Sequence, residues 1–207
     1  MKRRVGILIS GRGSNMASLL RAAADPAYPA VIALVLSNNP DAPGLDTARA
    51  AGIATAAVDH RPYRRDRAAH EAGLAEALDT AGIEIICLAG YMRLLTPYLV
   101  GRYAGRMLNI HPSLLPAFPG LDTHARALAA GVRLHGCTVH LVTEAMDDGP
   151  ILGQAAVPVL PGDDAQTLAA RVLAQEHLLY PLALRAFIEG TAILPPPDAA
   201  LINPAPK

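Results

Sequence analysis

The stretch Glu84-Ile-Ile-Cys-Leu-Ala89 sets the expected architecture, because every side chain after its first residue is apolar. Successive side chains of a strand point to opposite faces of a sheet, so this stretch offers neither face to water. Strands of this kind lie in the middle of parallel sheets that helices cover on both sides. We therefore expect a buried central strand over Ile83–Ala89.

Three similar apolar runs precede this strand, and each is followed by a segment rich in helix formers. This alternation predicts an α/β fold with a doubly wound, mostly parallel sheet and helices on both faces, as in Rossmann-like proteins. The helical segments are long enough for right-handed crossovers. The apolar runs are Val5–Ser10, Val31–Leu36 and Ile53–Val58, and the expected helices are Asn15–Ala24, Gly44–Ala51 and Arg67–Ala81.

The pattern changes after a further apolar run, Met107–Ile110. Prolines crowd into residues 112–119, which excludes regular helix or a central strand and predicts a shaped loop. Two more strands are expected, at Thr138–Val142 and at Gly153–Val157. Pro158 should end the second of them or mark it as an edge strand.

A long helix is expected close to the C-terminal end, from about residue 164 to Phe187. Asp163 or Asp164 would cap its start, and Gly190 would stop it. Because proline lacks an N–H and crowds the preceding turn, Pro181 should kink or split this helix.

The chain has 207 residues, of which 52% are hydrophobic, enough for a single domain over residues 1–192. Residues 193–207 are expected to form a proline-rich tail. Eighteen basic residues balance eighteen acidic ones without long runs, which argues against nucleic-acid or membrane partners. No run is apolar for long enough to span a bilayer or to act as a signal peptide. The isolated Cys87 and Cys137 predict buried thiols in a cytoplasmic protein.

The first motif that carries chemistry is Ser10-Gly-Arg-Gly-Ser-Asn15, between the first strand and the first helix. Glycines let main-chain N–H groups approach an anion at a helix start, so a phosphate is the natural ligand. The spacing matches neither the dinucleotide nor the nucleoside triphosphate fingerprint. A tight turn without a ligand is the alternative.

A second motif, Asn109-Ile-His111, ends an expected strand, where open α/β sheets place their ligand crevices. The spacing of two directs both side chains to the same face. An amide donor beside an imidazole can hold the oxyanion of a tetrahedral intermediate and move a proton. A histidine that is merely hydrogen-bonded in a loop is the alternative.

The connection between the last two strands carries a pair of acids, Asp147 and Asp148. A carboxylate brought beside His111 would favour the charged imidazolium and so supply an acid near neutral pH. Two solvated surface acids are the plainer interpretation of this loop.

Seven segments together resemble the phosphoribosylglycinamide formyltransferases, in order from about Val5 to Ala192. Asp122 departs from this pattern because many relatives have histidine there, and Asp148 departs because it replaces a glycine. The acidic role therefore stays on Asp147, which occupies the matching position. The segments are Ser10–Asn15, Ala89–Leu95, Asn109–Pro116, Pro119–His124, His135–His140, Asp147–Pro150 and Gln175–His177.

The resemblance implies transfer of a formyl group from the co-substrate 10-formyltetrahydrofolate to the amine of 5-phosphoribosylglycinamide in purine biosynthesis, without a metal. Asn109 and a protonated His111 would meet the developing alkoxide. Asp147 would keep His111 charged and orient the water that relays a proton to the leaving folate nitrogen. His140 would either support Asn109 and His111 or be a satisfied core histidine, and His124 is a further histidine near the site.

The resemblance also assigns the residues that bind the two substrates. Main-chain N–H groups of Gly13, Ser14 and Asn15 would hold the ribonucleotide phosphate, and Glu176 would accept hydrogen bonds from the ribose, unless it is an exposed helix acid. Leu88, Leu99 and Val142 would line the pterin pocket or the core. The remaining folate-binding residues are Arg67 at the folate tail, Met92, Arg93, Leu94, Leu95, Asn109, Thr143, Glu144, Ala145, Met146 and Asp147.

Three other functions remain open from the sequence. Formyl-tetrahydrofolate deformylase normally carries an extra N-terminal domain, and the formyltransferases acting on methionyl-tRNA or an aminosugar carry a C-terminal one. A binding module without catalysis would tolerate loss of Asn109, His111 and Asp147. The partners expected here are two small molecules, and the sequence does not decide between a monomer and a homodimer.

Overall fold

The structure is a computed structural model that describes residues 1–191; the expected tail falls in residues 192–207, outside the described residues. Within residues 1–191, a seven-stranded sheet has the order β3-β2-β1-β4-β5-β6-β7. Its strands are β1 (Arg3–Ile9), β2 (Ala30–Ser37), β3 (Thr55–Ala57), β4 (Ile85–Leu88), β5 (Met107–His111), β6 (Leu134–Leu141) and β7 (Ile151–Pro158).

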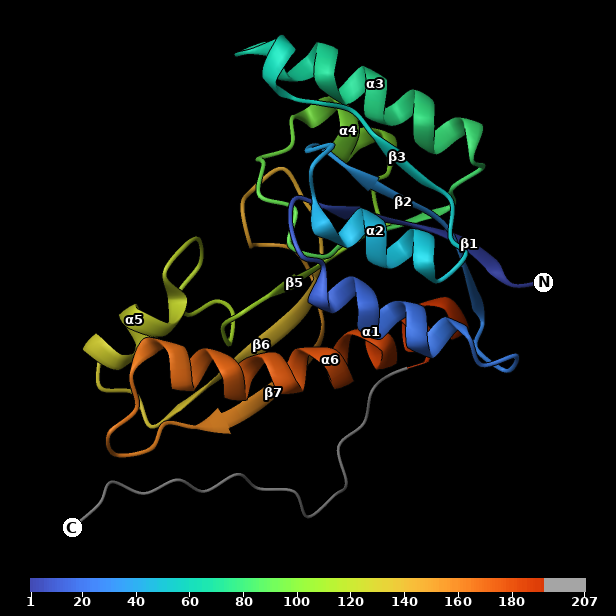
Figure 1. Ribbon diagram of the computed structural model, residues 1–207. Coiled ribbons are helices and arrows are strands. Elements are labelled where there is room, and N and C mark those ends of the chain that lie inside the picture. The colour runs from blue at the N-terminus through green and yellow to red at the C-terminus, as the bar shows by residue number, and fades with distance from the viewer. Residues whose placement is uncertain (192–207) are drawn as a thin grey trace.

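Helices cover both faces of the sheet, which confirms the predicted α/β class. Figure 1 shows α1, α2 and α6 on one side of the strands and α3 and α4 on the other. The helices are α1 (Ser14–Ala23), α2 (Pro43–Ala50), α3 (Arg67–Thr80), α4 (Pro97–Arg102), α5 (Thr123–Ala129) and α6 (Ala165–Glu189), with a short 3-10 turn η1 at Arg61–Tyr63.

The central strand β4 is buried on both faces, as its composition predicts. Ile85 and Cys87 pack into the apolar cluster that contains α1 and α6, whereas Ile86 and Leu88 pack into the cluster on the side of α3 and α4. This alternation explains why no polar residue interrupts the strand.

The direction of strand addition reverses between β1 and β4, which are parallel neighbours. In open α/β sheets such a reversal leaves a crevice at the carboxyl ends of the two strands. The loops after β1 and β4 therefore border one site. Beyond β5 the pairing becomes antiparallel, and β7 is an edge strand whose last residue is Pro158, as predicted.

The last helix was predicted correctly at its ends, and the predicted split at Pro181 is wrong; a kink there stays a prediction. Asp164 caps α6 together with Thr167, and Gly190 closes it with a left-handed backbone. The helix is not split at Pro181. Proline removes one main-chain hydrogen bond, but the fully buried Tyr180 and Leu184 anchor the helix to the sheet on either side.

Candidate active site

The loop after β1 leads into the N-terminus of α1. The N-cap residue offers no side-chain hydrogen bond to the first main-chain N–H groups of this helix. Gly13 is the N-cap residue with φ 68°, a left-handed backbone conformation that suits glycine. A pocket of about 270 Å³ lies against this turn. Its lining residues are Ser10, Gly11, Arg12, Gly13, Ser14, Asn15, Ala89, Gly90 and Met92, so the loops after β1 and β4 share it, as the topology requires.

Glu176 of α6 lies beside this loop, and the expectation of an exposed helix acid is wrong. The Asn15 Nδ2 donates to the Glu176 Oε2 at 2.6 Å, and both residues are buried, at 8% and 7% exposure. Burial raises the pKa of Glu176, and the hydrogen bond from Asn15 partly opposes that shift. The sequence analysis did not predict this bond, and the ribose-binding role that the resemblance gives to Glu176 stays a prediction.

Asn109 and His111 lie on the same face of β5, as their spacing predicts. The residues between and before them, Ile110 and Leu108, pack into the cluster on the opposite face. Across the antiparallel pair, Asn109 lies opposite His140. Asn109 is therefore level with Leu88, the last residue of β4, and His111 lies beyond the end of that strand.

His140 contacts Asn109 directly. Its Nδ1 lies 3.0 Å from the Leu141 carbonyl oxygen, which can only accept a hydrogen bond, and its Nε2 lies 3.1 Å from the Asn109 Nδ2. Burial lowers the pKa of His140. A neutral ring with its proton on Nδ1 satisfies both contacts, because Nε2 then accepts from the Asn109 amide. His140 therefore orients Asn109.

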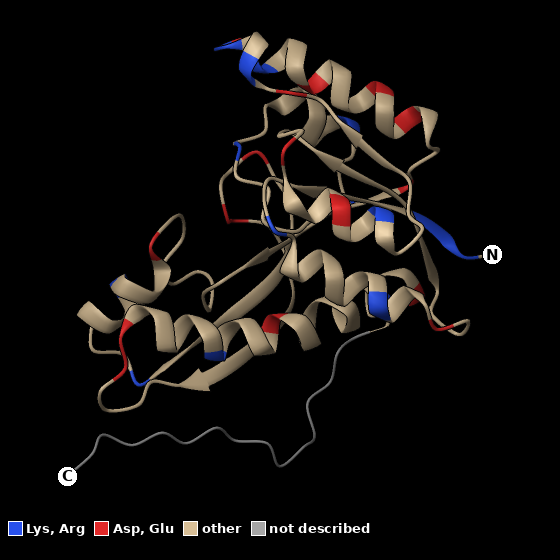
Figure 2. Ribbon diagram, in the orientation of Figure 1, with Lys and Arg blue, Asp and Glu red and all other residues tan. Residues whose placement is uncertain are grey.

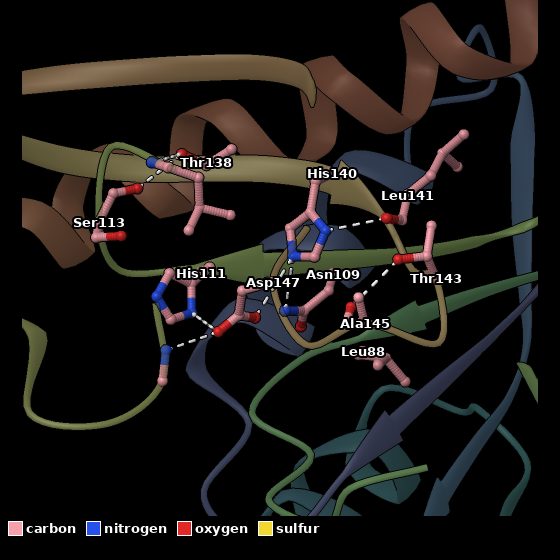
Figure 3. A network of polar contacts seen from close by, with 12 residues as sticks. Leu88, Asn109, His111, Ser113, Thr138, His140, Leu141, Thr143, Ala145 and Asp147 are labelled. Carbon is pink, nitrogen blue, oxygen red and sulfur yellow. Dashed lines mark hydrogen bonds and ion pairs between the residues drawn. The ribbon is translucent and has the colours of Figure 1, made fainter. Parts of the chain in front are cut away.

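Asp147 reaches His111 because the loop between β6 and β7 folds back over the sheet. Its Oδ2 lies 3.4 Å from the His111 Nδ1 and accepts from the Gly120 main-chain N–H at 2.8 Å. Its Oδ1 lies 3.8 Å from the His140 Nε2. Figure 3 shows this carboxylate between the two histidines with Asn109 alongside. Asp148, by contrast, is exposed.

The second nitrogen of His111 has a partner that the sequence did not reveal. The His111 Nε2 lies 3.1 Å from the Phe118 carbonyl oxygen. Both ring nitrogens thus face acceptors, an arrangement that an imidazolium satisfies with its two N–H donors. Phe118 presents this carbonyl from a left-handed conformation, φ 56°, within the proline-rich loop whose Leu115–Pro116 peptide is cis.

His124 contacts His135, and its pKa is lowered by burial and also by the charge of His111, which is near enough to act on it. The His135 Nε2 is 3.2 Å from the His124 Nδ1. Burial lowers the pKa of both, that of His135 to about 4. Among the described residues, no group of three or more His, Cys, Asp or Glu side chains could hold a metal ion.

A larger open pocket, of about 880 Å³, lies between the start of α3 and the segment after β4. Figure 2, which colours the ribbon by residue type, shows basic residues gathered at that start of α3. Arg67, Met92, Arg93 and Leu94 of the predicted folate site line this pocket, and Leu95 lies next to them in the chain. The full lining is Arg64, Arg65, Asp66, Arg67, Ala68, Met92, Arg93, Leu94 and Thr96.

The other predicted folate residues fall into two groups. Thr143, Glu144, Ala145 and Met146 are exposed on the loop that carries Asp147. Leu99 is fully buried in the core on the α3 and α4 side, so core packing is the correct interpretation of that residue.

Comparison with known proteins identifies the family. Residues 3–184 match the formyl transferase family. The chain belongs to this family. A solved phosphoribosylglycinamide formyltransferase from Brucella melitensis is 58% identical to this formyl transferase, with a TM-score of 0.87 over 93% of this chain and 99% of the other.

Two further relatives differ in length. The phosphoribosylglycinamide formyltransferase of Escherichia coli is 45% identical over 184 residues, which are 89% of this chain and 86% of that protein. The trifunctional purine biosynthetic protein of Drosophila melanogaster is 44% identical over 94% of this chain, which spans only 14% of that relative's length. Within residues 1–191, no helix of this formyl transferase is long and apolar enough to cross a membrane.

Proposed function

We propose that this formyl transferase moves the formyl group of 10-formyltetrahydrofolate to the amine of 5-phosphoribosylglycinamide, giving formylglycinamide ribonucleotide and tetrahydrofolate. One observation carries the proposal: Asp147 lies 3.4 Å from His111 and 3.8 Å from His140, which in turn contacts Asn109, so the three predicted residues belong to one polar network. An open helix start suited to phosphate lies at the neighbouring strand end. The names of the Brucella and Escherichia coli relatives agree with it.

The ribonucleotide would occupy the pocket after β1. Main-chain N–H groups of Gly13, Ser14 and Asn15 would meet its phosphate, where the helix dipole also favours negative charge. The carboxylate of Glu176 already accepts from Asn15, and it has a second oxygen to accept from the ribose hydroxyls. This placement would direct the glycyl amine toward the end of β5.

The folate would occupy the larger pocket, with its anionic tail toward the arginines of the α3 start and its pterin along Met92–Leu95. Exposed apolar side chains and main-chain groups at the edge suit a flat heterocycle. The loop from Thr143 to Asp147 would close the opposite side. The formyl carbon would then lie between the two pockets, in front of Asn109.

In the reaction, the amine attacks the formyl carbon and forms a carbon–nitrogen bond, while the carbonyl oxygen gains negative charge. The second amide hydrogen of Asn109 would meet this oxygen, since the first is held by His140. A protonated His111 beside Asp147 would add positive charge at the same place. Asn109, His111 and Asp147 would therefore stabilise the tetrahedral intermediate more than they stabilise the bound substrates.

Collapse of the intermediate breaks the bond between the formyl carbon and the folate nitrogen. The attacking amine loses a proton and the folate nitrogen gains one, so the proton balance is zero. A water hydrogen-bonded to the Asp147 carboxylate would relay that proton. No step in this sequence uses a metal. The cytoplasm is the proposed compartment, on the ground that Cys87 and Cys137 are free thiols.

The experiment is a spectroscopic assay of 10-formyltetrahydrofolate consumption, run with and without the ribonucleotide. We expect consumption only when 5-phosphoribosylglycinamide is present, with equimolar formylated product. Consumption without it would indicate a hydrolase and overturn the transferase proposal. No consumption in either case would leave only a binding module.

A further inference from the structure

The segment Met92–Thr96 borders both pockets, since Met92 lines each of them. Its side chains contribute to the core only in part, because Met92 and Leu94 are 68% and 56% exposed, whereas Leu95 packs against the apolar cluster on the α3 and α4 side. Packing of this one side chain does not by itself fix the main chain of the whole segment. Polar groups at its two ends also hold it.

At the first end, the hydroxyl of Ser10 holds the main chain of Met92. The Ser10 Oγ accepts from the Met92 N–H at 2.8 Å and donates to the Asn38 Oδ1 at 2.6 Å. Asn38 is buried, at 4% exposure, and belongs to the loop after β2. The Ser10 N–H also donates to the Gly90 carbonyl oxygen at 3.2 Å. The start of the segment is thus tied to β1.

At the second end, a buried carboxylate holds Thr96. Glu71 of α3 is 2% exposed. Its Oε1 accepts from the Thr96 N–H at 2.7 Å, and its Oε2 accepts from the Thr96 hydroxyl at 2.6 Å and from the Leu99 N–H at 3.3 Å. Charge-assisted bonds of this kind are the stronger ones in proteins.

The position of Glu71 on α3 gives these bonds a second consequence. Arg67 lies four residues earlier on α3, one turn away, and lines the pocket from the opposite wall. The Glu71 carboxylate therefore sets the distance between the arginine-bearing start of α3 and the segment Met92–Thr96. These are the two walls of the larger pocket.

We infer that Ser10 and Glu71 are positioning residues for the folate substrate, which fix the main chain of Met92–Thr96 as a preformed wall of its pocket. The inference rests on the proposed function, because it assigns that pocket to folate. A wall that is already ordered before binding lowers the entropy cost of binding the ligand. If these bonds served only to cap α4, their loss would lower stability and would not weaken the binding of one substrate more than that of the other.

The test compares Ser10→Ala and Glu71→Gln with Glu76→Gln, an exposed acid on the same helix as Glu71. Glutamine keeps the shape of Glu71, but its amide nitrogen is a donor. It would replace one carboxylate oxygen that accepts from the Thr96 or Leu99 groups. We expect the Kd for tetrahydrofolate, measured by anaerobic calorimetry, to rise about tenfold in Ser10→Ala and Glu71→Gln and to be unchanged in Glu76→Gln. In Glu71→Gln, the KM for the ribonucleotide should stay within twofold of wild type.

Hydrogen exchange gives a readout that does not depend on activity. The Met92 amide should exchange faster in Ser10→Ala, and the Thr96 and Leu99 amides faster in Glu71→Gln. Faster exchange with an unchanged Kd for tetrahydrofolate would overturn the inference. So would a matched loss of affinity for both substrates in Glu71→Gln.

A milder variant covers the case in which Glu71→Gln does not fold. Thr96→Val removes only the hydroxyl donor and leaves the carboxylate and the main-chain bond, so a smaller rise in the same Kd is expected. An unchanged Kd in that variant would count against the inference. Wild-type protein that binds tetrahydrofolate but transfers no formyl group would overturn the proposed function alone.

Discussion

In the proposed reaction, Asn109 and His111 act most directly on the developing oxyanion. Asn109 would supply a hydrogen-bond donor and the protonated His111 a nearby positive charge, and loss of one such stabilising group usually costs about 3 to 4 kcal/mol of transition-state stabilisation. We expect Asn109→Ala and His111→Ala each to lower kcat by about two orders of magnitude or more. Steady-state kinetics with both substrates checks this.

Unfolding temperatures of the same two variants serve as the control. They should stay close to the wild-type value, because neither side chain belongs to either apolar cluster. Near wild-type formyl transfer by His111→Ala would show that another group supplies the acid.

In the proposed reaction, His140 would act through Asn109, which it contacts. Because its Nδ1 proton is used by the Leu141 carbonyl, its Nε2 accepts from the amide of Asn109 and fixes the direction of that amide. We expect His140→Phe to lower kcat about tenfold or more with little change in either KM, since the loss concerns orientation and not binding. The partly buried His177 offers a control, His177→Gln, which should leave kcat unchanged.

At the scale of elements, the hairpin loop between β6 and β7 determines where Asp147 lies. The close approach of Gly149 to the preceding strand lets this loop fold back, since a Cβ at that position would overlap the Leu141 carbonyl oxygen. We expect Gly149→Ala to displace the loop and lower kcat by about 10-fold to 100-fold, because small misplacements of catalytic groups are costly.

The matched control is Gly101→Ala in α4, where an added Cβ meets nothing within 4 Å. Alanine favours helix over glycine, so this variant should keep its kcat and gain slightly in stability. If Gly149→Ala retained full activity and an unchanged crystal position of Asp147, close packing at Gly149 would not be what places the loop.

The elements that the sequence predicted are those with a strong local pattern. The seven strands carry apolar runs bounded by turn residues, and α1, α2, α3 and α6 are rich in helix formers, so each was expected close to its observed bounds except β6, which begins at Leu134 and not at Thr138. The short α4 and α5 were not. The six-residue α4 begins at Thr96 before Pro97, a local N-cap pattern, but it is too short to show a periodic apolar face. Its further N–H partner, the distant Glu71, is revealed only by the fold.

The same distinction applies to the site. The shared face of Asn109 and His111 follows from a spacing of two within one strand, and the place of the phosphate loop follows from its glycines. The bonds of Phe118 to His111 and of Glu71 to Thr96 join segments that only the folded chain brings together. Asp147 was singled out over Asp148 by resemblance, since the two acids look alike in the sequence.

For the whole molecule, buried histidines make stability depend on pH. Burial lowers the pKa of five histidines in the folded state, namely His70, His124, His135, His140 and His177. Between about pH 6.5 and the folded values, the unfolded chain binds more protons than the folded one, so acid favours unfolding. The raised pKa of Glu176 acts in the opposite direction but is a single group.

We therefore expect the Tm to be highest above about pH 6.5 and to fall as the pH is lowered toward 4. His135 should contribute strongly, since burial lowers its pKa to about 4. In His135→Gln the decline of Tm across this range should be shallower, which differential scanning calorimetry at several pH values can measure. A decline as steep as in wild type would assign the acid sensitivity to other groups.

The two buried thiols can report how fast each half of the sheet opens. Cys87 lies on β4 in the parallel half of the sheet and Cys137 on β6 in the antiparallel half, both with no exposure. Burial raises the pKa of each to about 12, so neither reacts with an alkylating reagent until its strand opens. Pulsed alkylation followed by mass spectrometry should therefore time the opening of each half separately. Equal rates at both positions would mean that the two halves come apart in one concerted event.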